Sequence, residues 1–195
     1  MIRFLHLFSL ILLLLTTQAC YQEHAGVVRE GGGDVILESR TPGNSSKLIA
    51  IFGDIGRDSP SQQRIADLGV AWNERSPFDA VIFPGDILNT DKPYDVAFRE
   101  RLYEPMKLLF DSNTPIHSVL GNHCHKDGHA LNQINDERLG MDGNQYYRLI
   151  GDQGLYSFYM LDSDVIEFDQ GQREWLVDTL RKDESRWLVC VLHVP

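Results

Sequence analysis

Four short motifs along the chain carry residue types that bind metal ions or transfer protons. Three begin with glycine after an apolar run: Gly-Asp-Ile-Gly at residues 53–56, Gly-Asp at 85–86 and Gly-Asn-His at 121–123. The fourth is His193, which directly follows the apolar run 187–192. Carboxylate, amide oxygen and imidazole suit hard to borderline metal ions, and a carboxylate can bridge two of them. The motifs therefore indicate a metal site.

Each of these motifs alone is a weak signal. A Gly-Asp pair after a strand is usually only a turn, because glycine lets the chain bend sharply there. Gly-Asn-His is more informative, since the end of a buried strand rarely needs Asn followed by His. All three motifs in order, with a later strand that ends in His193, favour one shared site over four unrelated turns.

The elements that would position these residues follow from short apolar runs that alternate with helical patterns. Strands are predicted at 48–52, 79–83, 116–120, 146–150, 155–161 and 187–192, and helices at 60–74, 95–111 and 170–181. On the first helix, Ile65, Leu68 and Trp72 share the apolar face. Such alternation implies βαβ units around a buried sheet. In these sheets, sites form at the carboxyl ends of the strands, which is where the four motifs lie.

The motifs resemble the calcineurin-like metallophosphoesterase superfamily, and residues 53–56 are similar to the purple acid phosphatase form of its first motif. The resemblance spans residues 47–195 and includes Phe-Tyr-Met-Leu-Asp-Ser at 158–163. It implies an α/β fold in which two sheets form a layered β-sandwich flanked by helices. Because the sequence stops before the family's final Gly-His-x-His motif, we expect the fold to be incomplete at the C-terminus, with mainly the first sheet present.

The resemblance also implies roles for the site residues. Asp54 would bind a first metal ion, Asp86 would bridge both ions, and Asn122 and His193 would bind the second. His123 would stay off the metals and stabilise the phosphoryl oxygens or protonate the leaving group. The implied cofactors are two ions of Fe, Mn or Zn. The implied reaction is hydrolysis of phosphate esters through in-line attack by a metal-activated hydroxide.

Three positions depart from the family pattern. Gly56 stands where most of the superfamily has a histidine, and Asn89, a further candidate ligand, stands where purple acid phosphatases have the tyrosine that gives their colour. Cys124 replaces the acidic residue that orients the histidine of the third motif, so the partner of His123 is expected to be missing. Asn89, Cys124 and the missing final Gly-His-x-His motif support an alternative, a catalytically inactive surface lipoprotein that uses the fold as a binding module. Residues 47–195 alone are expected to fold poorly and to hydrolyse phosphate esters feebly.

The first twenty residues predict export. Arg3 precedes an apolar run at 7–15 that is broken only by Ser9, and small residues lead into Cys20. The run has the length of a signal-peptide core and is too short for a bilayer, which takes about 20 apolar residues. Cys20 resembles the lipidated cysteine of bacterial lipoproteins. We expect location in the periplasm, at the cell surface or on a membrane, with a lipid anchor on Cys20 as the only membrane contact.

Composition bounds the rest of the chain. With 195 residues, 43% of them hydrophobic, one domain is expected at 47–195, preceded by a tether at 21–46. The formal charge of −10 excludes a nucleic-acid surface, but bound metal ions would still let a phosphate ester approach. His125 and His129 follow the third motif in a loop and are expected to be solvated or to line the rim of the site. Cys190 is expected to be buried.

Overall fold

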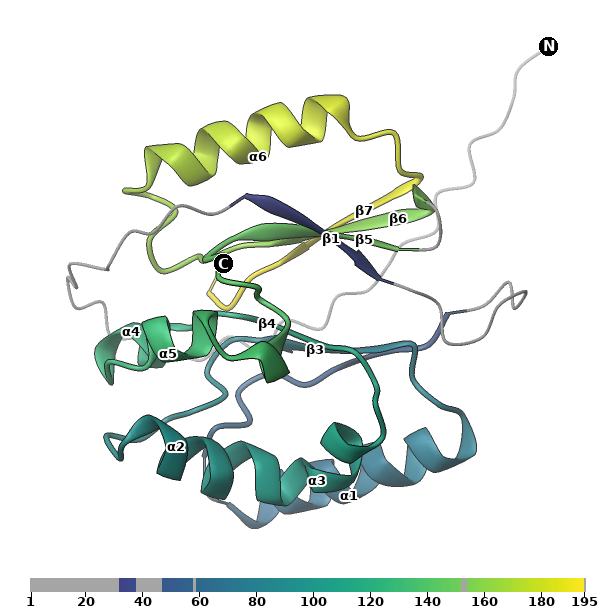
Figure 1. The fold of residues 1–195 in the computed structure, drawn as a ribbon, viewed down its shortest axis with the longest axis vertical. Coiled ribbons are helices and arrows are strands. Elements are labelled where there is room, and N and C mark those ends of the chain that lie inside the picture. The colour runs from purple at the N-terminus through teal and green to yellow at the C-terminus, as the bar shows by residue number, and fades with distance from the viewer. Residues whose placement is uncertain (1–31, 38–46, 58, 152–153, 195) are drawn as a thin grey trace.

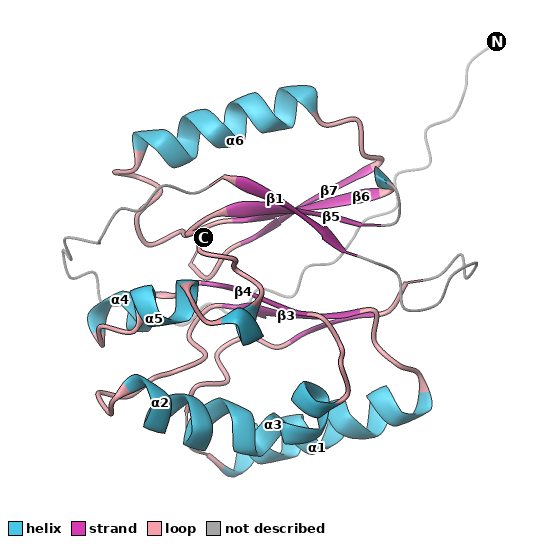
Figure 2. Ribbon diagram, in the orientation of Figure 1, coloured by secondary structure: helices cyan, strands magenta, loops and turns pink. Residues whose placement is uncertain are grey.

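The computed structural model describes residues 32–37, 47–57, 59–151 and 154–194. It contains two β-sheets that face each other, with helices on the outer side of both (Figures 1 and 2). The layered α/β sandwich predicted from the sequence is therefore confirmed. The predicted signal peptide, Cys20 and most of the predicted tether lie outside the described residues.

One sheet is entirely parallel, and we call it the parallel sheet. Its order is β2 (Ile49–Ile51), β3 (Ala80–Pro84) and β4 (Ile116–Val119). Helix α1 (Pro60–Arg75) connects β2 to β3, and three consecutive helices connect β3 to β4: α2 (Tyr94–Ala97), the π-helix η1 (Phe98–Tyr103) and α3 (Glu104–Asp111). After β4 come α4 (Asn122–Lys126), α5 (Ala130–Ile134) and the short 3-10 helix η2 (Glu137–Leu139).

The second sheet, which we call the mixed sheet, has four described strands. Its order is β1 (Gly33–Leu37), β5 (Tyr147–Gly151), β6 (Tyr156–Met160) and β7 (Trp187–Val191). Strands β5 and β6 are antiparallel, and the other two pairs are parallel. Helix α6 (Gln170–Lys182) covers its outer face (Figure 1). The expectation that the chain supplies mainly the first sheet is wrong, and β1 comes from the segment predicted to be a tether.

Two hydrophobic cores lie on opposite faces of the parallel sheet. Along β3, Ala80 and Ile82 belong to the core between the sheets, whereas Val81 and Phe83 belong to the core beneath the helices. All four side chains are fully buried. Successive side chains of a strand point to opposite faces, so an uninterrupted apolar strand supplies both cores.

Helix α1 is present as predicted, but its buried face is not the predicted one. Ile65, Leu68 and Trp72 are exposed by 41%, 62% and 59%. The helix instead buries Gln62, Ala66 and Gly69. A side chain at position 69 would collide with the ring of Phe52. Close approach of the helix to the sheet therefore requires small residues on the inner face, and the large apolar ones lie outside.

Strand β7 is more exposed than its apolar sequence predicts. Trp187 is 59% exposed and Leu188 is 48% exposed. Cys190 of the same strand is exposed as well, so the expectation that it is buried is wrong; both Cys124 and Cys190 are free thiols. The reason is that β7 is an edge strand of the mixed sheet among the described residues. No helix in the described part of the chain is long and apolar enough to cross a membrane.

Candidate metal centre

Three of the predicted ligands come together where the two sheets meet. Asp54, Asp86 and His193 each offer one ligand atom, and these atoms lie within 4.8 Å of one another. Asp54 follows β2, Asp86 follows β3 and His193 follows β7, so both sheets contribute. Residues up to 139 positions apart in the chain would not meet in this way by local structure alone, and only the sandwich brings His193 to the aspartates.

Both aspartates have backbone conformations that side-chain-bearing residues rarely adopt. The φ angle is +56° at Asp54 and +49° at Asp86. Such conformations cost about 1–3 kcal/mol each and persist only where the surroundings hold them. The surroundings here are two hydrogen bonds between the loops: the N–H of Gly56 donates to Asp86 O at 2.9 Å, and the N–H of Asn89 donates to Gly56 O at 3.3 Å.

Two glycines allow this close approach. A Cβ atom on Gly56 would lie 2.6 Å from the carbonyl oxygen of Asp86 and equally near the backbone of Ile87. A Cβ atom on Gly121 would run into the Asp86 carboxylate. The position at which most of the superfamily has a histidine is therefore filled here by the backbone of the second motif.

His193 is oriented with one nitrogen toward the aspartates. Its Nδ1 lies 3.0 Å from the carbonyl oxygen of Pro84, and its Nε2 lies 3.3 Å from Asp86 Oδ2. A carbonyl oxygen only accepts, so Nδ1 carries the proton and Nε2 faces the site. Burial lowers the pKa of His193, but the hydrogen bond to Asp86 and its negative charge outweigh burial and raise the pKa above the usual value. Two carboxylates and an imidazole nitrogen in this arrangement fit a divalent or trivalent metal ion.

His123 has a partner that the sequence analysis missed. The backbone N–H of His123 donates to Asp86 Oδ1 at 3.0 Å, and its ring Nδ1 lies 3.2 Å from Asp127 Oδ2. The expectation that His123 lacks an orienting partner is therefore wrong. The carboxylate comes from four residues later, because positions i and i+4 are neighbours on a helix. That spacing was the available signal.

Asn122 and Asn89 are placed beside the centre by their neighbours in the chain. Asn122 is the first residue of α4 and directly precedes His123, whose backbone N–H donates to the Asp86 carboxylate. The backbone of Asn89 is tied to Gly56. Ligation by either side-chain amide stays a prediction.

Cys124 has a structural environment. The thiol is fully buried; it accepts from the N–H of Gly121 at 3.3 Å and donates to Gln133 Oε1 at 3.0 Å. Burial raises the pKa of the thiol to about 12, so Cys124 is a neutral thiol that supports the turn before α4.

His125 and His129 are neither solvated loop residues nor rim residues. Nε2 of His125 lies 2.9 Å from Asp162 Oδ2, and Nε2 of His129 lies 2.8 Å from the carbonyl oxygen of Thr90. The His125 side chain is 4% exposed and His129 is 4% exposed as a whole residue. Both expectations for these residues are wrong. The predicted loop forms two short helices instead, with His125 in α4 and His129 directly before α5.

A candidate metal centre where two helix-flanked sheets meet agrees with the class of protein that the motifs indicate. The family model described as calcineurin-like phosphoesterase matches residues 47–195. The chain therefore belongs to the calcineurin-like phosphoesterase family, and the resemblance read from its motifs is confirmed.

A solved structure supports the fold independently. The chain is similar to a purple acid phosphatase, PPD1, isolated from seeds of yellow lupin (Lupinus luteus), with a TM-score of 0.56 and 16% sequence identity. The match covers 78% of this chain and 31% of the lupin chain, so this chain spans about a third of that protein's length. Comparison with curated proteins found no match.

Proposed function

We propose that this protein hydrolyses phosphate esters in an acid-phosphatase-like reaction that depends on two metal ions. The observation that carries the proposal is the meeting of Asp54, Asp86 and His193 within 4.8 Å in a chain of the calcineurin-like phosphoesterase family. Bound metal ions supply positive charge for the phosphoryl oxygens and lower the pKa of bound water. Iron, manganese and zinc all suit the oxygen and nitrogen donors.

Asp86 is the residue best placed to serve both ions. One of its carboxylate oxygens lies 3.3 Å from His193 Nε2, and the other accepts from the N–H of His123 at 3.0 Å. Asp54 and His193 each offer a ligand atom within 4.8 Å of one on Asp86, and Asn122 begins α4 next to His123. In this proposal Asp54 would hold the first ion, and Asn122 and His193 would hold the second.

His123 is the proposed proton donor. Asp127 accepts a hydrogen bond from Nδ1, which fixes the plane of the ring and leaves Nε2 to donate to a leaving oxygen or to a phosphoryl oxygen. The side chain is 22% exposed, so a substrate can reach it. The alternative of an inactive binding module rested partly on a missing partner for His123, and Asp127 supplies that partner.

The test is a hydrolysis assay on the whole protein with a chromogenic phosphomonoester. We expect turnover with manganese, zinc or iron, none with a chelator, and none in Asp86→Asn. Asp91→Asn, which makes the same charge change at an exposed residue of the same loop, is the matched control and should stay active. A folded, metal-loaded protein that turns over no phosphate ester, or equal activity in both variants, would contradict the proposal.

A further inference from the structure

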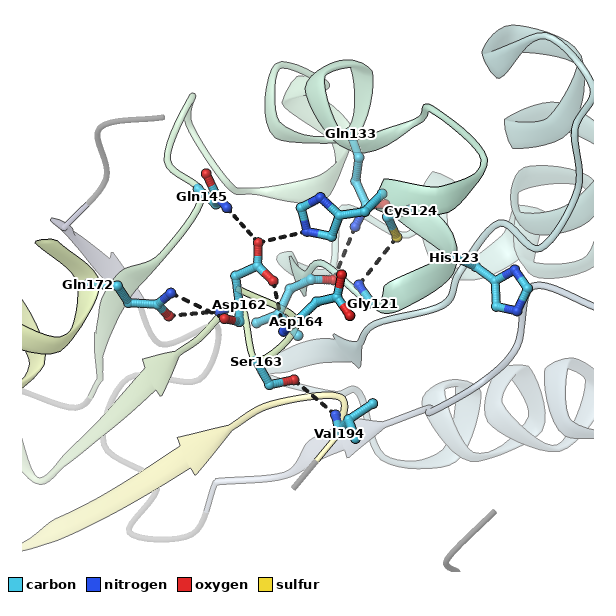
Figure 3. A network of polar contacts seen from close by, with 12 residues as sticks. Gly121, His123, Cys124, Gln133, Gln145, Asp162, Ser163, Asp164, Gln172 and Val194 are labelled. Carbon is cyan, nitrogen blue, oxygen red and sulfur yellow. Dashed lines mark hydrogen bonds and ion pairs between the residues drawn. The ribbon is translucent and has the colours of Figure 1, made fainter. Parts of the chain in front are cut away.

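Asp162 follows β6 on the mixed sheet and is fully buried. Its Oδ2 accepts from Gln145 Nε2 at 2.6 Å and lies 2.9 Å from His125 Nε2, while Oδ1 accepts from the N–H of Asp164 at 3.2 Å (Figure 3). A buried carboxylate is costly unless hydrogen bonds satisfy it. Here both oxygens are satisfied, and one of the donors comes from α4, which follows the other sheet.

The backbone of Asp162 is fixed from the opposite side. Gln172 of α6 accepts from the N–H of Asp162 at 3.0 Å and donates to its carbonyl oxygen at 3.1 Å (Figure 3). Gln172 is itself fully buried. The carboxylate therefore holds His125 from an anchored position, because Asp162 cannot shift without breaking bonds to α6.

The next residue holds the end of β7. The Ser163 hydroxyl accepts from the N–H of Val194 at 2.9 Å (Figure 3). Val194 directly follows the candidate ligand His193. One dipeptide, residues 162–163, thus contacts both α4, which begins with Asn122 and His123, and the strand end that carries His193.

We propose that residues 162–163 are a positioning element that sets α4 of the parallel-sheet side against the end of β7. Asp162 acts through His125 on the helix that carries His123, and Ser163 acts on His193 through the backbone. The His123 ring points away from this network (Figure 3). The network therefore positions His123 through the helix α4 and not through direct contact with the ring. The inference rests on the proposed function, because it assigns a purpose to the geometry of that site.

A purely structural role for the network makes a different prediction. If the network only stabilised the fold, variants of equal stability would have equal activity and equal metal affinity. The informative pair is His125→Ala and His125→Gln, since a glutamine amide N–H reaches about as far as the imidazole Nε2 and can still donate to Asp162.

The experiment measures kcat, KM, manganese affinity by calorimetry and thermal midpoint in the whole protein. We expect His125→Ala to lower kcat by about 10–100-fold and to weaken manganese binding, the range seen when partners of metal-site residues are removed. His125→Gln should recover most of both. Asp162→Asn should resemble His125→Ala, because its amide NH2 group would replace one accepting oxygen and would face a group that also donates. The control Asp164→Asn keeps the backbone N–H that donates to Asp162 and should match the wild type.

Two results would overturn the inference: His125→Gln no better than His125→Ala at equal thermal midpoint, or Asp162→Asn no different from Asp164→Asn. If the buried variants do not fold, Ser163→Ala decides, since it must weaken manganese binding and an unchanged affinity would refute the positioning role. A wild type that binds manganese but hydrolyses nothing would refute the proposed function alone. The manganese affinities of the two His125 variants would then still decide the positioning role.

Discussion

At the residue scale, we expect metal binding at the candidate centre to depend most on Asp86. Both of its carboxylate oxygens are engaged, by His123 and by His193. We expect Asp86→Asn to lose most of its bound metal, because a neutral amide binds cations far more weakly and cannot bridge two of them. Elemental analysis of the purified variant measures this directly. Metal content equal to that of the wild type would show that the carboxylate is not a shared ligand.

The His125–Asp162 pair predicts a pH-dependent contribution to stability. Burial lowers the pKa of His125, but the hydrogen bond and charge of Asp162, together with the charge of Asp164, outweigh burial and raise the pKa above its ordinary value of 6.5. A raised folded-state pKa stabilises the protein fully below the unfolded value, and that stabilisation is lost as pH rises through the folded value. With chelator present, the wild type should therefore exceed His125→Gln in thermal stability most at about pH 5.5 and least at about pH 8.5. A difference that is constant or grows with pH would show that the pair is not ionic.

Some residues of the site could be predicted from sequence and others could not. Asp54, Asp86 and His193 follow buried strands, and the carboxyl ends of such strands gather in space. Asp127 does not follow this rule, and Asp162, although it follows the buried strand β6, contacts His125 instead of the other candidate ligands. The role of Asp127 depends on the short helix α4, which the sequence pattern did not predict. The role of Asp162 depends on the packing of one sheet layer against the other.

At the element scale, two backbone hydrogen bonds join the loops after β2 and β3. The loops can approach this closely because Gly56 has no side chain. We expect Gly56→Ala to destabilise the protein by about 1–3 kcal/mol, the usual cost of overpacking, and to weaken metal binding. Gly53→Ala is the matched control on the other side of Asp54, since a Cβ there would meet only Pro84 Cγ at 3.5 Å. Denaturant unfolding and manganese titration of the two variants measure the contrast. Equal behaviour would mean that the loops do not need this contact.

The elements themselves were largely predictable, and their orientations were less so. The apolar run at 79–83 correctly predicted the buried strand β3, and the helical pattern at 95–111 correctly predicted helical structure, which buries Leu102, Met106 and Leu109. Periodicity did not reveal the π-helix Phe98–Tyr103. It also chose the wrong face of α1, because hydrophobicity patterns favour large side chains whereas this interface requires small ones.

At the scale of the whole molecule, two edge strands expose apolar side chains. Ile51 of β2 is 57% exposed, and Trp187 and Leu188 of β7 are 59% and 48% exposed. Ile49 of β2 and Val189 of β7 pack against the same core between the sheets. Exposed apolar edge strands promote association, so we expect concentration-dependent self-association of the chain, reduced in Leu188→Lys. Light scattering measures it, and Val177→Lys on α6, a residue that is 45% exposed, is the control. Equal association in both variants would exclude the β7 edge.

The central claim is that ligands from both sheets form one metal centre, and anomalous X-ray scattering from manganese-soaked crystals tests it most directly. We expect anomalous peaks within about 2.0–2.6 Å of oxygen or nitrogen atoms of Asp54, Asp86 and His193. These peaks should disappear in crystals of Asp86→Asn. Anomalous peaks found only at other residues would contradict the claim of one shared metal centre. Unchanged peaks at this site in Asp86→Asn crystals would contradict it as well.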